Sequence, residues 1–214
     1  MSFFFSSPWF AEAGDAHEDL FLALNPDPVT GGEEPALVHL ARFASNVLPD
    51  VLVLMLVLAL LLGPRARVLR RDVLIVLAAM ALAWLAARAL QAAWPQPRPF
   101  VLGLGTPWLV HPASPSFPSM HATVAAAWAV SLAFWRRPVL TAAAVPMALL
   151  IAWSRVGLGV HFPIDVVVGV LLGAVAAGVT QACLSPVRLR WLQCMGRRTV
   201  RRHRARRLRL QRPA

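Results

Sequence analysis

Three short runs of the sequence combine residue types that suit phosphoryl transfer without a metal ion. They are Arg98-Pro99, Pro118-Ser119-Met120-His121, and Ser154-Arg155 followed by His161 and Asp165. Arginine and serine bind phosphate oxygens, histidine acts as a nucleophile or as an acid and base, and a carboxylate orients a histidine. Each run lies at the edge of an apolar stretch, beside helices of membrane-spanning length, so we expect the phosphate to belong to a lipid.

The third run has the most specific spacing. Gly157 and Gly159 let the chain turn out of one helix, and Pro163 favours the start of the next. His161 is therefore expected just before a helix, with Asp165 one turn further on. The aspartate can accept a hydrogen bond from one imidazole nitrogen and leave the other nitrogen free to attack. A carboxylate beside a membrane span also needs such a partner, because an unpaired charge there is costly.

The first two runs supply groups that suit a phosphate. Prolines on both sides of Arg98 stiffen its backbone, and its planar fork of donors matches phosphate oxygens. Ser119 is a favoured N-cap, so free backbone N–H groups would attract an anion close to His121. Other interpretations stay open: Arg98 could anchor a helix end at the membrane interface, and Ser119 could be an ordinary cap before an interfacial histidine.

The composition is that of a membrane protein. The 214 residues are 58% hydrophobic, with a mean hydropathy of +0.61, which is too apolar for an ordinary soluble domain. All 21 basic residues are arginines, and with 10 acidic residues the net charge is +11. Eight of the ten acidic residues lie in the first quarter of the chain, whereas eleven arginines and no acid follow from Arg188 onward.

Five apolar segments are expected to form helices. About 20 residues cross a bilayer core, and the third segment is short, so we expect it to extend into its flanks. The fold predicted is an all-α polytopic bundle of about five transmembrane helices, preceded by an interfacial N-terminal segment. The apolar segments cover residues 43–62, 73–94, 121–135, 139–156 and 163–184.

The chain divides into three parts. Residues 1–36 form an outward-facing or interfacial segment in which Phe3 to Phe10 suit a membrane interface, residues 37–187 are membrane-embedded, and residues 188–214 form a basic tail. In a five-span bundle all arginine-rich connections fall on one side, which the positive-inside rule makes cytoplasmic. The three chemical runs then share the outer face. The tail could bind nucleic acid, but directly after a membrane span it is better explained by topology and contact with anionic lipids.

The motifs resemble the three-part signature of the type 2 phosphatidic acid phosphatase superfamily. The resemblance covers roughly residues 90–170. Within that superfamily, residues 97–100, 116–119 and 159–165 look most like the bacterial undecaprenyl-pyrophosphate phosphatases. The motifs that carry the resemblance are Arg98-Pro99, Pro118-Ser119-x-His121 and Ser154-Arg155-x5-His161-x3-Asp165.

The resemblance implies a role for each motif residue. His161 would attack the terminal phosphorus and form a phosphohistidine, which Asp165 would orient and stabilise. His121 would protonate the leaving oxygen and then activate water. Ser154 would support the phosphate or cap the end of its own helix. The groups expected to hold the phosphoryl oxygens are Arg98, Arg155, Ser119 and Ser154.

Two positions depart from the family pattern. Gln91 stands where the family has a lysine, and we expect it to bind the phosphate as a hydrogen-bond donor, although it carries no charge. We expect Arg88, on the same helical face, to supply the missing charge to the phosphate, although it could instead snorkel toward the interface. Met120 stands where the broad family has glycine, and it could narrow the mouth of the site or contact the lipid chain.

The resemblance implies hydrolysis of undecaprenyl pyrophosphate at the periplasmic face of a bacterial inner membrane, with a cytoplasmic C-terminus. Alternative substrates are phosphatidic acid, phosphatidylglycerol phosphate or a lipid A phosphate. A lipid phosphotransferase and a non-catalytic membrane anchor are further alternatives. No cofactor or nucleic-acid partner is expected. No metal is expected either, since Cys183 and Cys194 lack metal-type spacing. His17, His39 and His111 are expected to be ordinary polar surface or interface residues.

Overall fold

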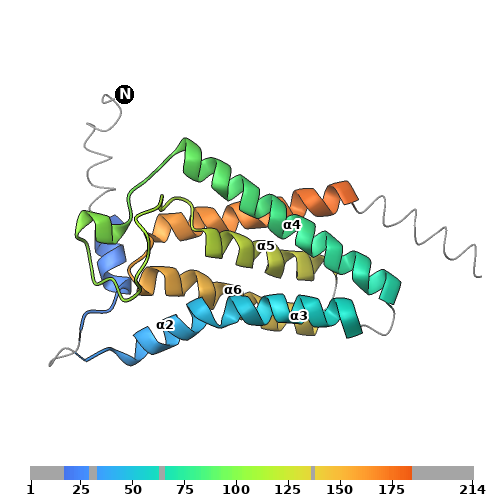
Figure 1. Ribbon diagram of the computed structural model, residues 1–214, viewed down its shortest axis with the longest axis horizontal. Helices are drawn as coiled ribbons and strands as arrows, with labels where there is room; N and C mark the ends of the chain where they lie inside the picture. The colour runs from blue at the N-terminus through green and yellow to red at the C-terminus, as the bar shows by residue number, and fades with distance from the viewer. Residues whose placement is uncertain (1–16, 29–32, 63–65, 136–137, 185–214) are drawn as a thin grey trace, which may run out of the picture.

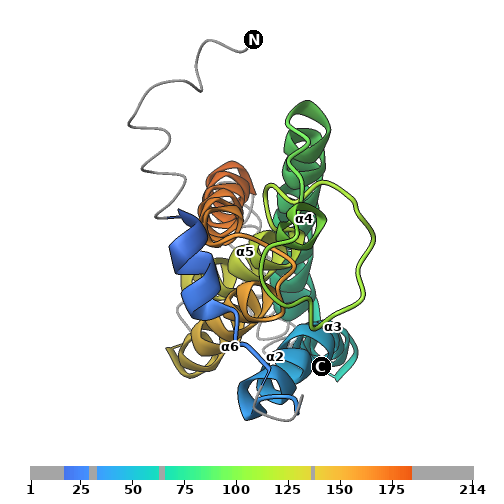
Figure 2. The ribbon, with the colours of Figure 1, turned by 90° about the vertical axis from the view of Figure 1, so that its left-hand side faces the viewer.

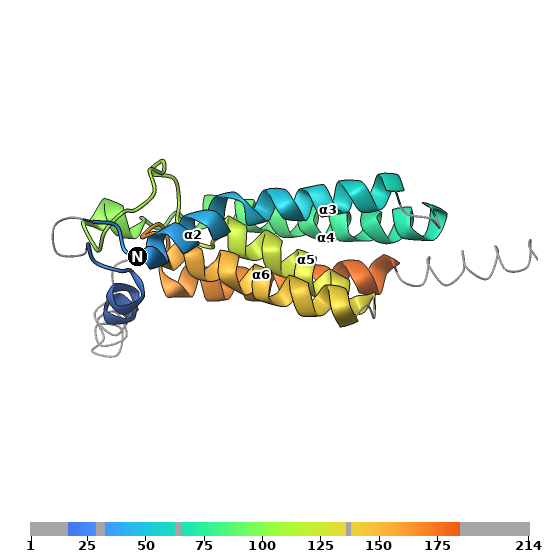
Figure 3. The ribbon, with the colours of Figure 1, turned by 90° about the horizontal axis from the view of Figure 1, so that it is seen from below.

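The protein is a bundle of long helices. The computed structural model describes residues 17–28, 33–62, 66–135 and 138–184, within which all regular structure is helical (Figures 1 and 3). The phenylalanines near the N-terminus and the basic tail lie outside these ranges. In chain order the helices are residues 17–24, α2 (Ala36–Asn46), α3 (Leu48–Leu62), α4 (Ala66–Ala93), the 3₁₀ turn η1 (Pro99–Leu102), α5 (Met120–Phe134), α6 (Pro138–Gly157) and Pro163–Leu184.

The prediction of an all-α membrane bundle is confirmed. Four of the described stretches are long and apolar enough to cross a membrane: Ala36–Leu58, Arg71–Ala93, Val139–Gly157 and Pro163–Leu184. The fifth predicted span is the shorter apolar helix α5. It does not extend toward the N-terminus as expected, because it begins at Met120 directly after its N-cap. At 1.5 Å per residue, its 15 residues cover only about 22 Å.

The first predicted span differs from the structure in its start and its continuity. It begins at Ala36 and breaks at Val47 into α2 and α3, which follow one another end to end (Figure 1). Pro49 lies in the first turn of α3, where it has no N–H to donate to the carbonyl of Ser45. The proline ring would also crowd that carbonyl, so a continuous helix is interrupted here.

Helix α5 is enclosed by its neighbours. It packs against α4 and α6, and Trp128 near its middle is only 1% exposed. The helix Pro163–Leu184 comes close because Gly173 lacks a side chain: a Cβ there would lie 2.1 Å from the carbonyl oxygen of Thr123. A helix that is apolar on all sides is expected to be buried in this way.

The connections that carry the three motifs meet at one end of the bundle. Residues 94–119 cross this end, and the turn of residues 158–162 lies beside them (Figures 1 and 2). Helix 17–24 packs against the same end, where Phe21 contacts the ring of Phe162 with centroids 5.4 Å apart. The sequence therefore brings segments far apart in the chain to a single surface.

Asn25 ties these segments together. Its Nδ2 donates to the carbonyls of Thr106 and Gly157, both at 3.1 Å, and its Oδ1 accepts from the N–H of Thr106 at 2.6 Å. The turn also requires Gly159, which has a φ of 71° and would place a Cβ 2.5 Å from the carbonyl oxygen of Thr106. Residues 17–28 thus hold the loop and the turn that bear the site.

Replacing Asn25 with alanine should therefore weaken both the fold and the activity. Asn25 is 3% exposed, and its loss leaves two carbonyls and one N–H without partners. We expect the free energy of unfolding to fall by about 2 kcal/mol or more, together with kcat. Thermal unfolding and turnover in detergent measure both. Asp27→Ala, at an exposed position, is the matched control, and a melting temperature equal for both variants would contradict this role.

Candidate active site

His161 is held by Asp165 through an intervening serine. Ser116 Oγ donates to Asp165 Oδ2 and lies 3.2 Å from His161 Nδ1, whereas Nδ1 and Oδ2 are 3.5 Å apart. The hydroxyl therefore accepts from the imidazole N–H and passes the interaction to the carboxylate. The backbone N–H of Phe162 also donates to Oδ2, at 3.0 Å. This network fixes the proton on Nδ1 and leaves the lone pair on Nε2.

The expected histidine and aspartate are thus side by side, and Ser116 lies between them, a contact that the sequence motifs did not indicate. Ser116 belongs to residues 116–119, which resemble a phosphatase motif, so the motif pointed to this segment of the chain. The motif did not show that the serine contacts His161 and Asp165. Ser116 is fully buried, and His161 and Asp165 are each only 2% exposed.

His161 is a neutral imidazole in this environment. Burial lowers its pKa from 6.5 to about 4. The hydrogen bond and charge of Asp165 act in the opposite direction, and the charges of Arg98 and Arg155 lower the pKa further. At neutral pH the Nε2 lone pair is therefore free of a proton, as a nucleophile requires.

Arg98 is built into the site. It is 3% exposed, and its Nη1 lies 2.9 Å from the carbonyl oxygen of Val160 and 3.2 Å from Nε2 of His161. Its Nε and Nη2 donate to the carbonyl and hydroxyl of Ser114, at 2.9 and 3.2 Å. These contacts favour a site residue over an anchor at the membrane interface.

Arg155 and Ser119 present buried donors. Arg155 is 1% exposed, and its Nη1 donates to Ser45 Oγ on α2. Among the described residues, its Nε and Nη2 and the hydroxyl of Ser119 have no hydrogen-bond partner. Unpaired buried donors are costly, so this arrangement fits an anion. Ser45 carried no signal in the sequence, because it lies in an apolar stretch far from the motifs.

Ser119 occupies the predicted N-cap position of α5, but its side chain makes no capping hydrogen bond. Its backbone N–H instead donates to the carbonyl of Asp165, at 2.9 Å. The start of α5 is thereby joined to the first turn of the helix Pro163–Leu184. His121 follows in the first turn of α5 and is half-buried.

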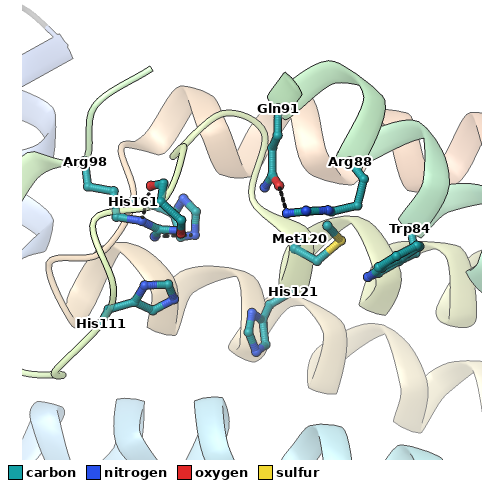
Figure 4. A pocket seen from close by; sticks show the side chains of 9 residues that line it. Trp84, Arg88, Gln91, Arg98, His111, Met120, His121 and His161 are labelled. Carbon is teal, nitrogen blue, oxygen red and sulfur yellow. Dashed lines mark hydrogen bonds between the residues drawn. The ribbon is translucent and has the colours of Figure 1, made fainter. Parts of the chain in front are cut away.

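A pocket of about 330 Å³ opens beside Arg98, His121 and His161 (Figure 4). Five of the predicted site residues line it. His111 also lines it, and is half-buried rather than an ordinary surface residue. In the described ranges of the chain, no group of three or more His, Cys, Asp or Glu is placed to hold a metal ion. The lining consists of Trp84, Arg88, Gln91, Arg98, His111, Ser114, Met120, His121 and His161.

Two predicted phosphate ligands use their polar atoms elsewhere. The hydroxyl of Ser154 donates to the carbonyl of Ile151 at 2.7 Å, so the structure favours the helix-end role over phosphate support. Gln91 lines the pocket, but its Nε2 donates to the carbonyl of Pro118 at 3.1 Å and its Oε1 accepts from Arg88 at 3.4 Å. Its amide oxygen and one of the two hydrogens on Nε2 are therefore used within the protein, and the second hydrogen stays available to a phosphate.

Comparison with known proteins agrees with this fold. Residues 72–188 match the family model of the PAP2 superfamily. Over 183 residues, covering 86% of both chains, the protein is 34% identical to the Escherichia coli K12 protein named "Putative undecaprenyl-diphosphatase YbjG". The chain therefore belongs to the PAP2 superfamily, as its motifs predict. It is a multi-pass membrane protein of the lipid phosphatase family within that class.

Two solved structures share the fold. One is Aquifex aeolicus LpxE, with 27% identity and a TM-score of 0.60 over 77% of this chain and 93% of that one. The other is a transmembrane PAP2 type phosphatidylglycerolphosphate phosphatase from Bacillus subtilis, with 22% identity and a TM-score of 0.61. That match covers 86% of this chain and 90% of the other.

The lowered pKa of His161 predicts an unusual pH dependence. Attack requires the neutral imidazole, so kcat/KM should persist below pH 6 and fall as the pH approaches about 4. The profile is measured in detergent, and the substrate's own ionisation, followed by ³¹P NMR, is divided out. Asp165→Asn removes an interaction that raises this pKa, so its residual activity should fall at a still lower pH. An acid limb centred near 6.5 in the unmodified protein would contradict the assignment.

Proposed function

We propose that this protein hydrolyses undecaprenyl pyrophosphate to undecaprenyl phosphate and phosphate. The observation that carries the proposal is the buried, neutral His161, held through Nδ1 with Nε2 beside Arg98 at the pocket. This is the geometry of an activated nucleophile with an orienting group. The relative with 34% identity, whose name contains undecaprenyl-diphosphatase, favours this lipid.

In the first step, Nε2 of His161 attacks the terminal phosphorus. The bond from phosphorus to the bridging oxygen breaks, and His121 donates a proton to the departing lipid phosphate. The phosphohistidine carries a positive imidazole ring, which the contacts of Nδ1 with Ser116 and Asp165 stabilise. Arg98 Nη1, now 3.2 Å from Nε2, is placed to turn its donor to a phosphoryl oxygen.

In the second step, water attacks the phosphohistidine. His121 accepts a proton from the water, the bond between Nε2 and phosphorus breaks, and phosphate leaves. Arg98 holds the phosphoryl oxygens in both steps, together with the unpaired donors of Arg155 and Ser119. Fixed positive groups of this kind lower the barrier by stabilising the charge of the transition state.

The pocket suits a substrate whose tail stays in the membrane. It opens at the end of the bundle, beside the outer turns of α4, where Trp84 is 47% exposed. We assign this end to the periplasmic face of a bacterial inner membrane and the tail of residues 188–214 to the cytoplasm, in contact with anionic lipids, because the arginine pattern favours this orientation. In this arrangement residues 1–36 lie outside or at the interface, and residues 37–187 form the embedded phosphatase.

Phosphatidic acid, phosphatidylglycerol phosphate and lipid A phosphates are the second candidate class. The likeness to LpxE and to the phosphatase from Bacillus subtilis favours the same reaction on a different lipid. A phosphotransferase would pass the phosphoryl group from His161 to another lipid in place of water. Release of free phosphate without an acceptor distinguishes hydrolysis from that transfer.

Phosphate release by the purified protein tests the proposal. With EDTA present, we expect release from undecaprenyl pyrophosphate to exceed release from phosphatidic acid. His161→Ala should reduce turnover by at least about 1,000-fold, because it removes the nucleophile. His39→Ala, at an exposed position on α2, is the matched histidine control. Phosphate release from phosphatidic acid alone would contradict the proposed substrate. An active His161→Ala variant would contradict the proposed mechanism.

A further inference from the structure

The pocket extends beyond the groups that would hold the transferred phosphate. Arg98 and His161 lie together on one side, and Arg88 enters from α4 on the other with its guanidinium directed toward them (Figure 4). When Nε2 attacks phosphorus, the leaving oxygen departs on the opposite side, since the attacking and leaving atoms are roughly in line. The leaving group is thus expected on the Arg88 side of the pocket.

Arg88 has donors to offer there. Its Nη1 donates to Gln91 Oε1 at 3.4 Å, and within the described chain this is the one hydrogen bond found for its guanidinium. Gln91 is itself fixed, because it is 6% exposed and donates to the carbonyl of Pro118. The amide oxygen of Gln91 is therefore a fixed acceptor for Arg88.

The surroundings of Arg88 favour an anion. The residues that line the pocket include a second arginine and three histidines but no carboxylate. An arginine near the end of a membrane span could instead reach for lipid headgroups. Arg88 as a whole is exposed, but its guanidinium points into the pocket, where it donates to Gln91 (Figure 4).

We propose that Arg88, positioned by Gln91, binds the leaving phosphate of a lipid diphosphate and so selects diphosphates over monophosphates. This inference rests on the proposed function. As the bond between Nε2 of His161 and the terminal phosphorus forms, the bond from that phosphorus to the bridging oxygen breaks. The electron pair stays on that oxygen, which becomes a terminal oxygen of the lipid monophosphate, and Arg88 donates to this phosphate. When the substrate is a lipid monophosphate, the leaving group is the lipid alcohol, which carries no second phosphate for Arg88 to bind.

Two substrates with the same tail test this role. Initial rates on farnesyl diphosphate and farnesyl monophosphate are compared for the unmodified protein, Arg88→Met and Arg88→Lys. Methionine keeps an apolar stem and removes the charge, so kcat/KM for the diphosphate should fall about 10- to 100-fold while the monophosphate rate changes little. Lysine should restore part of the selectivity, because it keeps the charge. Inorganic pyrophosphate should also inhibit Arg88→Met less strongly, with inhibition by inorganic phosphate unchanged.

The control is Arg42→Met, which removes an arginine that pairs with Glu34 at 2.7 Å and does not line the pocket. It should leave the ratio of diphosphate to monophosphate activity unchanged. An equal loss on both substrates for Arg88→Met, or no loss on either, would overturn the inference and leave the proposed function standing. An unmodified protein that hydrolyses phosphatidic acid but no isoprenoid diphosphate would overturn both.

Discussion

The rest of the site depends on the interaction that keeps His161 buried, neutral and correctly turned. A histidine that is 2% exposed beside two buried arginines would lose its orientation without a fixed partner for Nδ1. Ser116 and Asp165 provide that partner from two different segments, the loop before α5 and the helix that starts at Pro163. Because the carboxylate also accepts from the backbone N–H of Phe162, the turn and the side chain of His161 are fixed together. The free lone pair on Nε2 is a consequence of this arrangement.

The short length of α5 determines where the pocket lies in the bundle. Helix α5 has 15 residues and starts further into the bundle than the neighbouring ends of α6 and Pro163–Leu184 (Figures 1 and 3). Met120 and His121, from its first turn, line the pocket together with the outer turns of α4. A phosphate bound there lies next to apolar helices, so a lipid can deliver its headgroup while its tail stays in the membrane. The length of one helix thus links the fold to the class of substrate.

The motif residues and the helical fold were predictable from the sequence, because they depend on residue type, spacing and apolar length. Arg98, His121 and His161 line one pocket, as the outer-face position and the family resemblance of their motifs predict, and Asp165 lies beside His161, as their spacing predicts. Contacts made across the bundle were not predictable. Ser45 reaches Arg155 only because α2 packs against α6, and Asn25 finds its partners only when three distant segments meet. The break at Val47 and the hydrogen bond from Ser154 to the carbonyl of Ile151 were not predictable either. Both depend on local backbone hydrogen bonding, which the pattern of apolar residues does not show.

The most direct test of this account is the position of the phosphoryl group in the covalent intermediate. The protein is mixed with a lipid diphosphate labelled at its terminal phosphate, quenched in base during turnover, and digested for phosphopeptide mapping and NMR. The account predicts phosphate on His161, attached to Nε2, because Ser116 and Asp165 occupy the Nδ1 side. Attachment to Nδ1 of His161, or to His121, would contradict it.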